Sequence, residues 1–478
     1  MDETLRGQID AWTEADEHDK VIDVLGRIQS EDRDFEEAGL LARAYNNLGE
    51  YEKALELLDS TGEEGTEDTN WNFRKGYALY FLDRYKEALA CFNKADELTP
   101  DDEDTLDFIR SCNSHLPFRK RVQDFWKWFT DNEEGLARIV ENRGQLESGD
   151  AVEFVTAGTN LINEDVHFNL GGDYEFTFSV EGSTHLFYLY PYVVSQLPAQ
   201  FRDKWHFFPF NQGTDASFSF GMYGVNVDMA QVQVSAAYQE DINAFNINFY
   251  EEQLCSLEEA QSYNAYYIMM EIMLGEGLSY QYVGSVEKAD APLENSMKLP
   301  ELKAYITDTL KAHDKEIFDN PQQVYTGYRF EPQESEELRF DVVAGSSCFQ
   351  PLVADYYNGS EELFNRLNRF GAQAVFIAFP YENNEEGDGK KALDFRYELE
   401  DRLSEELLAP EGLGLLLGGA VGIGTCYIDL LLFDEPAFME KIVPFLKDYP
   451  QYRFYLSDFR QGSDLCRLYE TEDDETEE

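Results

Sequence analysis

The sequence is poor in basic residues and in histidine. Its 478 residues include 38 lysines and arginines against 95 aspartates and glutamates, which gives a formal net charge of −57, and only 6 histidines. Such a chain is repelled by other polyanions at long range, so nucleic acid and anionic membranes are excluded as expected partners. The sequence contains neither an H-E-x-x-H pattern nor a C-x-x-C pair, so we expect no metal site and no cofactor.

Long apolar runs are also missing. The stretch 413–423 is interrupted by glycines and is shorter than the roughly 20 residues that a membrane-spanning helix needs. The first ten residues are polar and acidic, and we expect no export signal there. The 6 cysteines are widely spaced, which is typical of reduced thiols rather than of a disulfide framework. These features predict a cytoplasmic protein.

The sequence nevertheless has ample material for folded cores. Hydrophobic residues make up 43% of the chain and include 35 phenylalanines and 29 tyrosines, so disorder of the whole chain is excluded. At about 150 residues per domain, the length predicts roughly three folded units.

Two segments near the amino end align without a gap at a spacing of 34 residues. The residues that coincide are Ala42 with Gly76, Tyr51 with Tyr85, Ala54 with Ala88, and Leu58 with Phe92. Each segment has the pattern of an apolar helix, a short polar turn and a second amphipathic helix. A further helical pair is expected at 5–29. A period of this length predicts an array of stacked helix pairs.

The second segment resembles the tetratricopeptide repeat, whose small and large residues are matched at Gly76, Ala88, Phe92, Ala95 and Pro100. The earlier segment departs from the family pattern because it has Thr61 in place of the usual alanine and lacks the closing proline. The resemblance implies a concave surface, formed by the first helix of each repeat, that binds peptides or partner proteins.

On this chain the concave surface would carry six candidate partner-binding residues. They are Arg43, Asn46, Asn47, Phe73, Tyr77 and Tyr80. A cationic group beside aromatic rings and amides suits an extended peptide that has a carboxylate. The alternative is that the three aromatic residues pack against the next domain.

Beyond residue 118 the 34-residue spacing ends and the composition changes. Alternating aromatic and β-branched runs predict antiparallel sheets, with a helix at 257–273 covering one of them. The resulting domain prediction consists of a helical array at 1–118, an α+β domain at 119–285, a helical connector at 286–325, an α+β domain at 326–468 and a disordered acidic tail at 469–478. The last α+β domain resembles uncharacterised bacterial domains of unknown function.

Glycines cluster between residues 412 and 424. Backbone amides in a glycine-rich turn can hold a phosphate. Here, however, the glycines follow a predicted helix and precede a strand, which is the reverse of a dinucleotide fingerprint, and close chain packing is the favoured interpretation. An enzymatic or small-ligand site near this turn is the alternative function.

The sequence therefore predicts a multidomain α plus α/β protein, with a tetratricopeptide-like array followed by two α+β domains whose sheets are largely antiparallel. Its expected function is non-catalytic protein–protein interaction, as an adaptor with an immunity or regulatory role. A non-catalytic protein is favoured over an enzyme. The negative charge suits a basic protein or peptide partner.

Overall fold

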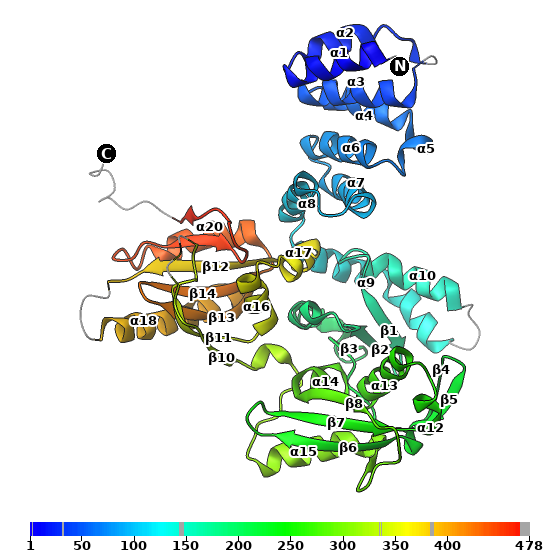
Figure 1. Ribbon diagram of the computed structural model, residues 1–478, viewed down its shortest axis with the longest axis vertical. Helices are drawn as coiled ribbons and strands as arrows, with labels where there is room; N and C mark the ends of the chain where they lie inside the picture. The colour runs from blue at the N-terminus through cyan, green and yellow to red at the C-terminus, as the bar shows by residue number, and fades with distance from the viewer. Residues whose placement is uncertain are drawn as a thin grey trace. The chain divides into compact units, whose positions relative to one another are not determined.

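The structure, a computed structural model, describes residues 1, 3–30, 33–142, 148–333, 335, 337–382 and 387–468 (Figure 1). The predicted acidic tail at 469–478 lies outside the described residues. The chain divides into two compact units. Unit 1 comprises Met1–Lys120, Phe364–Gln373 and Leu432–Lys441, and the other described residues belong to unit 2.

The first part of unit 1 is a stack of helix pairs, coloured blue in Figure 1. Its helices are α1 (Glu3–Glu14), α2 (His18–Leu25), α3 (Phe35–Asn47), α4 (Tyr51–Asp59), α5 (Gly62–Gly65), α6 (Thr69–Phe81), α7 (Tyr85–Leu98) and α8 (Glu103–His115). The predicted pair at 5–29 is confirmed as α1 and α2. The aligned residues Ala54, Ala88 and Phe92 are completely buried, so the repeat pattern marks the residues at which the helices pack.

Gly76 shows why one of the aligned positions must be small. It is buried in α6, and a Cβ at this position would lie 2.9 Å from the ring of Phe92 on α7. A larger side chain would therefore force the two helices of the repeat apart.

Two later segments of the chain complete unit 1. The Asn113 side chain of α8 donates a hydrogen bond to Asn368 Oδ1 of α17 (Glu362–Arg369) at 3.0 Å, and both residues are buried. Arg369 pairs with Asp96 at 3.0 Å. The backbone N–H groups of residues 118 and 119 donate to the carbonyl oxygens of residues 371 and 433. The end of the helical array is thus covered by residues from much later in the chain.

Unit 2 contains most of the long helix α9 (Phe118–Glu141) and all of the described strands in residues 167–298. A three-stranded sheet has the order β1-β2-β3, β4 and β5 form a hairpin, and a four-stranded sheet has the order β8-β7-β6-β9. The strands are β1 (His167–Gly171), β2 (Glu175–Ser179), β3 (His206–Phe208), β4 (Ser219–Met222), β5 (Val225–Asp228), β6 (Gln233–Gln239), β7 (Ala244–Tyr250), β8 (Val283–Lys288) and β9 (Met297–Lys298). Further helices in this region are α10 (Ser148–Thr159), α11 (Tyr190–Ser195), α12 (Glu252–Cys255), α13 (Glu259–Leu274), α14 (Glu276–Tyr282) and α15 (Leu302–Ala312).

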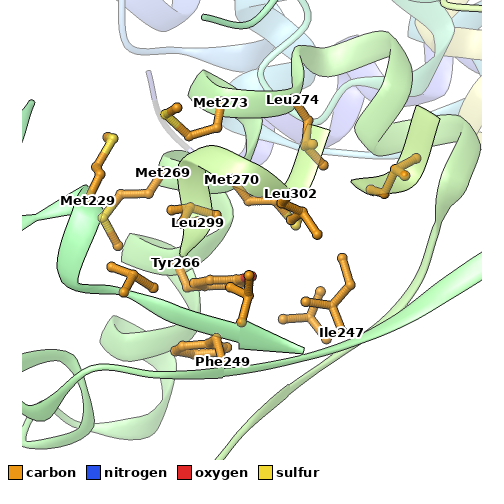
Figure 2. Close-up of a cluster of buried hydrophobic side chains, with 14 of the residues drawn as sticks. Met229, Ile247, Phe249, Tyr266, Met269, Met270, Met273, Leu274, Leu299 and Leu302 are labelled. Atoms are coloured by element: carbon orange, nitrogen blue, oxygen red, sulfur yellow. The ribbon is translucent and has the colours of Figure 1, made fainter. Parts of the chain in front are cut away.

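The four-stranded sheet has a core rich in methionine. Figure 2 shows Tyr266, Met269 and Met270 of α13 beside Phe249 and Ile247 of β7. The rings of Tyr266 and Phe249 are stacked, with centroids 3.8 Å apart. Each of these large side chains contributes roughly 1.5–3 kcal/mol when it is buried. The predicted covering helix at 257–273 is confirmed as α13.

The last sheet has seven strands in the order β10-β11-β13-β14-β12-β15-β16. They are β10 (Thr326–Arg329), β11 (Val342–Ser347), β12 (Gln373–Pro380), β13 (Gly414–Gly422), β14 (Thr425–Leu432), β15 (Tyr455–Asp458) and β16 (Cys466–Arg467). The helices that accompany them are α16 (Gln350–Asn358), α18 (Asp388–Arg402), α19 (Ala409–Glu411) and α20 (Glu435–Leu446). Nearly every residue of β12 and β14 is buried, as expected for central strands covered on both faces. The predicted fold class is confirmed.

The glycine-rich segment 412–424 is a strand rather than the predicted turn. Most of it is β13, which pairs with β11 so that Gly419 lies opposite Ser346. A Cβ at residue 419 would collide with the Tyr427 carbonyl oxygen and with the Glu400 side chain. Gly418, Gly419 and Gly422 are therefore explained by the close approach of neighbouring parts of the chain, which is the interpretation that the residue order favoured. The space that a phosphate would need above Gly419 is filled by protein atoms.

None of the helices in the described part of the chain combines the length and the hydropathy needed to cross a lipid bilayer. Across the same residues, no group of three or more His, Cys, Asp and Glu side chains is arranged to hold a metal ion.

A pocket between two repeat helices

A pocket of about 340 Å³ lies between α3 and α6 of unit 1. The residues that line it are Arg43, Asn46, Asn47, Asn70, Phe73, Arg74 and Tyr77. Five of the six candidate residues from the sequence are therefore brought together. Tyr80, the remaining candidate, does not line the pocket.

The α3 side of the pocket depends on how α3 begins. Asp34 and Glu37 form a capping box, in which the Glu37 N–H donates to Asp34 Oδ1 at 2.8 Å and the Asp34 N–H donates to Glu37 Oε2 at 3.1 Å. Such a box satisfies two N–H groups that the first helical turn leaves unpaired. Once the start of α3 is fixed, residues 43, 46 and 47 share one face because they are three and four positions apart.

The α6 side is fixed in a similar way. Asp68 caps α6 by accepting the Trp71 N–H at 2.7 Å. The buried Asn72 side chain donates to the Asp68 carbonyl oxygen at 2.9 Å, which holds the loop before α6 against the helix. The lining residues of α6, at positions 70, 73, 74 and 77, follow the same spacing of three and four.

Asn46 joins the two helices and leaves one polar atom unused. Its Nδ2 donates to the Arg74 carbonyl oxygen at 2.9 Å, and the side chain is only 4% exposed. Its Oδ1 accepts no hydrogen bond from any described residue. An unpaired buried acceptor costs about 1–3 kcal/mol, so the pocket contains an acceptor that a ligand N–H would satisfy.

Two arginines supply positive charge. Arg43 is exposed, whereas Arg74 is partly buried, with its guanidinium against Gly39 of α3, where a Cβ would collide with it. Burial, together with the positive charge of Arg43, lowers the pKa of Arg74 to about 10, so Arg74 remains a cation at neutral pH. Within the described part of the chain, neither guanidinium forms an ion pair or a hydrogen bond.

The aromatic candidates differ in their surroundings. Phe73 packs edge-on against Phe92 and Phe108, with centroid distances of 5.5 and 5.7 Å. Tyr77 makes a similar contact with Phe108 at 5.3 Å, and burial raises its pKa. Tyr80 also packs on Phe108, at 5.3 Å. Phe73 and Tyr77 therefore have fixed rings that also line the pocket, whereas Tyr80 contributes to packing against α8.

Sequence reasoning missed Asn70 and Arg74. Both lie on the same face of α6 as Phe73 and Tyr77. The helical spacing of three and four residues would have found them, since positions 70, 73, 74 and 77 form one continuous stripe. Arg74 is important because, together with Arg43, it gives the pocket two positive charges instead of one.

A larger pocket, of about 520 Å³, lies in unit 2 and is lined in part by Asn211, Gly213 and Lys303. The Lys303 ammonium donates to the Gln212 carbonyl oxygen at 3.0 Å. None of its described lining residues has a buried polar side-chain atom without a partner. This pocket therefore gives no comparable indication of ligand chemistry.

Comparison with known proteins identifies one element of the chain. The model of the tetratricopeptide repeat family matches residues 72–102. No curated protein and no solved structure matches the sequence significantly, and the resemblance of the carboxy-terminal domain to bacterial domains of unknown function stays a prediction. Because the matched residues cover most of α6 and α7, the helix that forms one wall of the pocket belongs to a tetratricopeptide repeat, an element of general protein interaction.

Proposed function

We propose that the protein is a non-catalytic adaptor, and that the pocket between α3 and α6 holds an extended peptide segment of a partner protein. The observation that carries this proposal is the unpaired Asn46 Oδ1, which is buried and lies in the pocket. An extended peptide presents a free N–H group at almost every residue, and it therefore supplies the donor that Asn46 lacks. Phe73 and Tyr77 provide rigid apolar surface beside it.

The charge and the cysteines fit this role. A net charge of −57 favours protein partners over nucleic acid. All six cysteines, which lie in the described ranges, are free thiols, as in a reducing compartment such as the cytoplasm. Three of these thiols (Cys112, Cys348 and Cys426) are buried, and Cys466 is exposed. An immunity or regulatory role is a narrower hypothesis that rests on net charge, and its basic partner would bind the acidic exterior rather than a pocket lined by two arginines.

We also retain the predicted domain boundaries at 118 and 325 as part of the proposal. The predicted boundary at 285 falls inside β8 (Val283–Lys288), which pairs with β7. The predicted connector at 286–325 contains β9, which pairs with β6, and α15, whose buried side chains belong to the core of the same sheet, so we assign this segment to the preceding α+β domain. None of the described sheets joins strands from before residue 300 with strands from after residue 325. The α+β domains at 119–325 and 326–468 would then supply further binding surfaces, while the array captures the peptide.

The test is a selection of random peptides, displayed on phage, against the full chain. Asn70 is exposed at the pocket wall, so Asn70→Trp fills the pocket without disturbing buried packing. Ala90→Trp, on the exposed side of α7, is the matched control. We expect the selected peptides to bind Asn70→Trp at least tenfold more weakly and to bind Ala90→Trp unchanged. Selected peptides that bind both variants equally, or a selection that enriches none, would overturn the proposal.

A further inference from the structure

Within the described helical array, most cations form ion pairs, and Arg27, Arg33 and Lys86 are exceptions outside the pocket. Arg6 pairs with Glu36, Arg84 with Glu87 and Arg110 with Asp107. Such pairing is expected in a chain with 95 acidic and 38 basic residues. Arg43 and Arg74 are nevertheless without an ion pair among the described residues. The acidic chain therefore leaves two cations unpaired in one pocket.

The guanidinium groups of Arg43 and Arg74 repel each other. Both guanidinium groups are positively charged, so the charge of Arg43 disfavours the charged form of Arg74, and the carboxylate of Asp68 offsets part of this effect. Arg74 is also partly buried, so water and salt screen its charge less than they would on an open surface. An anion placed between the two groups would remove the repulsion and would replace the water that Arg74 has lost.

The side-chain amide of Asn46, which lines the same pocket, further restricts the kind of ligand that fits. Asn46 Oδ1 is an acceptor and needs a donor, which an anion without an N–H or O–H group, such as sulfate, does not provide. A peptide provides both groups at once, a carboxylate for the arginines and a main-chain N–H for Asn46. A single negative charge is also repelled less than a dianionic phosphate by a protein of net charge −57.

We infer that the pocket recognises a carboxylate of the bound segment through Arg43 and Arg74, while a main-chain N–H of the same segment donates to Asn46 Oδ1. This inference rests on the proposed function and names the chemistry of its ligand. The carboxylate belongs either to an acidic side chain or to the end of the partner chain. The pocket thus selects an acidic segment, although the protein as a whole is acidic.

The peptide library provides the first test, because the net charge of the protein biases it against acidic peptides. We expect peptides that depend on the pocket, by the Asn70→Trp criterion, to be enriched in Asp or Glu at one position or to require a free terminal carboxylate. Enrichment in Lys or Arg would overturn the inference. Pocket-dependent peptides with no preference for a carboxylate would overturn it as well, while leaving the proposed function intact.

Affinity measurements then show which carboxylate of the peptide is recognised and whether Arg43 recognises it. The probe is the most enriched peptide, labelled with fluorescein. It is compared with two modified peptides: in one, Glu or Asp is replaced by Gln or Asn, and in the other, the terminal carboxylate is amidated. We expect removal of the recognised carboxylate to weaken binding to the full chain roughly tenfold or more, and the two forms show which carboxylate it is. Arg43→Gln should abolish the difference, and Arg43 is exposed, so this variant should fold.

The matched control is Arg84→Gln, which removes the same charge from an exposed pair outside the pocket. It should keep the full preference for the carboxylate. If Arg43→Gln and Arg84→Gln reduce binding equally, the effect is one of net charge and the inference is wrong. Arg74→Gln provides a second variant, whose helical content is checked by circular dichroism before its affinity is interpreted.

Discussion

A buried ion pair in the seven-stranded sheet permits a quantitative test of the structure. The Arg339 side chain is completely buried, and its guanidinium makes two hydrogen bonds to Asp429 of β14, at 2.5 and 3.1 Å. Asp429 is only 1% exposed. Four aromatic rings surround the guanidinium with centroids 4.5–5.6 Å away, those of Tyr356, Phe376, Tyr427 and Phe459.

Replacement of one partner leaves the other charge buried and unpaired. We expect Arg339→Met to reduce the free energy of unfolding of this sheet by about 3–5 kcal/mol, and Asp429→Leu to have a similar effect. The double variant removes both charges and keeps apolar volume, so it should recover most of the loss. The interaction energy of the double-mutant cycle is then about as large as either single effect.

The assay must report on this sheet, and tryptophan fluorescence does not, because all five tryptophans precede residue 206. Cys426 of β14 is completely buried, and burial raises the pKa of its thiol to about 12, so it reacts with iodoacetamide only when the sheet opens. The labelling rate, followed by mass spectrometry, measures the open population. A loss of 3 kcal/mol corresponds to a roughly hundredfold faster reaction.

The control is Arg402→Met, which breaks more exposed ion pairs with Glu406 and Asp448 and a hydrogen bond to Tyr449 and should change the rate less than about fivefold. Single variants at Arg339 and Asp429 that stay within this range would refute the reasoning. A double variant that is labelled as fast as the single variants would also refute it.

Three further predictions concern other parts of the structure. Gly419→Ala should accelerate labelling of Cys426, since overpacking costs about 1–3 kcal/mol, whereas Gly424→Ala should not, because a Cβ at residue 424 meets no atom within 4 Å. Burial raises the pKa of Glu400 from 4.5 to about 7, so Glu400 holds its proton more tightly in the folded protein than in the unfolded chain. The free energy of unfolding should therefore fall by up to about 3 kcal/mol as the pH rises from about 4.5 to 7. Glu400→Gln should flatten this dependence, measured by hydrogen exchange of β14 at each pH; an unchanged slope would contradict it. Asp34→Ala should lower the free energy of unfolding by about 1 kcal/mol because it removes the cap of α3, and hydrogen exchange should become faster in α3 but not in α13. Equal exchange of α3 in the variant and in the unmodified protein would count against the capping role.

The helical array could be predicted because its signal is local and periodic. The 34-residue spacing identified the residues that pack within each helix pair, and the spacing of three and four on α3 brought Arg43, Asn46 and Asn47 onto one face. The unpaired state of Asn46 Oδ1 could not be predicted. It depends on where the Arg74 carbonyl oxygen lies, which is a property of how two helices pack rather than of either sequence segment.

The sheets were predicted less completely, because their contacts join distant residues. Alternating polarity indicated strands, but nothing local marks Asp429 as the partner of Arg339, 90 residues earlier. A cluster of glycines predicts a turn because glycine favours turns, whereas at Gly419 of β13 the Tyr427 carbonyl oxygen and the Glu400 side chain leave no room for a side chain. The buried face of α15, which carries Leu302, Ile306 and Leu310, was hidden within a polar stretch that was predicted to be a connector.

Unit 1 is made of three separate stretches of the sequence, so its parts are synthesised at different times. The pocket is built from residues up to 77, but unit 1 is complete only when residues 432–441 have been made. At about 5–20 residues per second, the interval from residue 120 to residue 441 lasts roughly 15–65 s. Throughout this interval all residues that line the pocket are already synthesised, whereas the residues that cover Asn113 and Phe118, both buried in the complete unit, are not. A chain cut after residue 120 would lack these covering residues permanently.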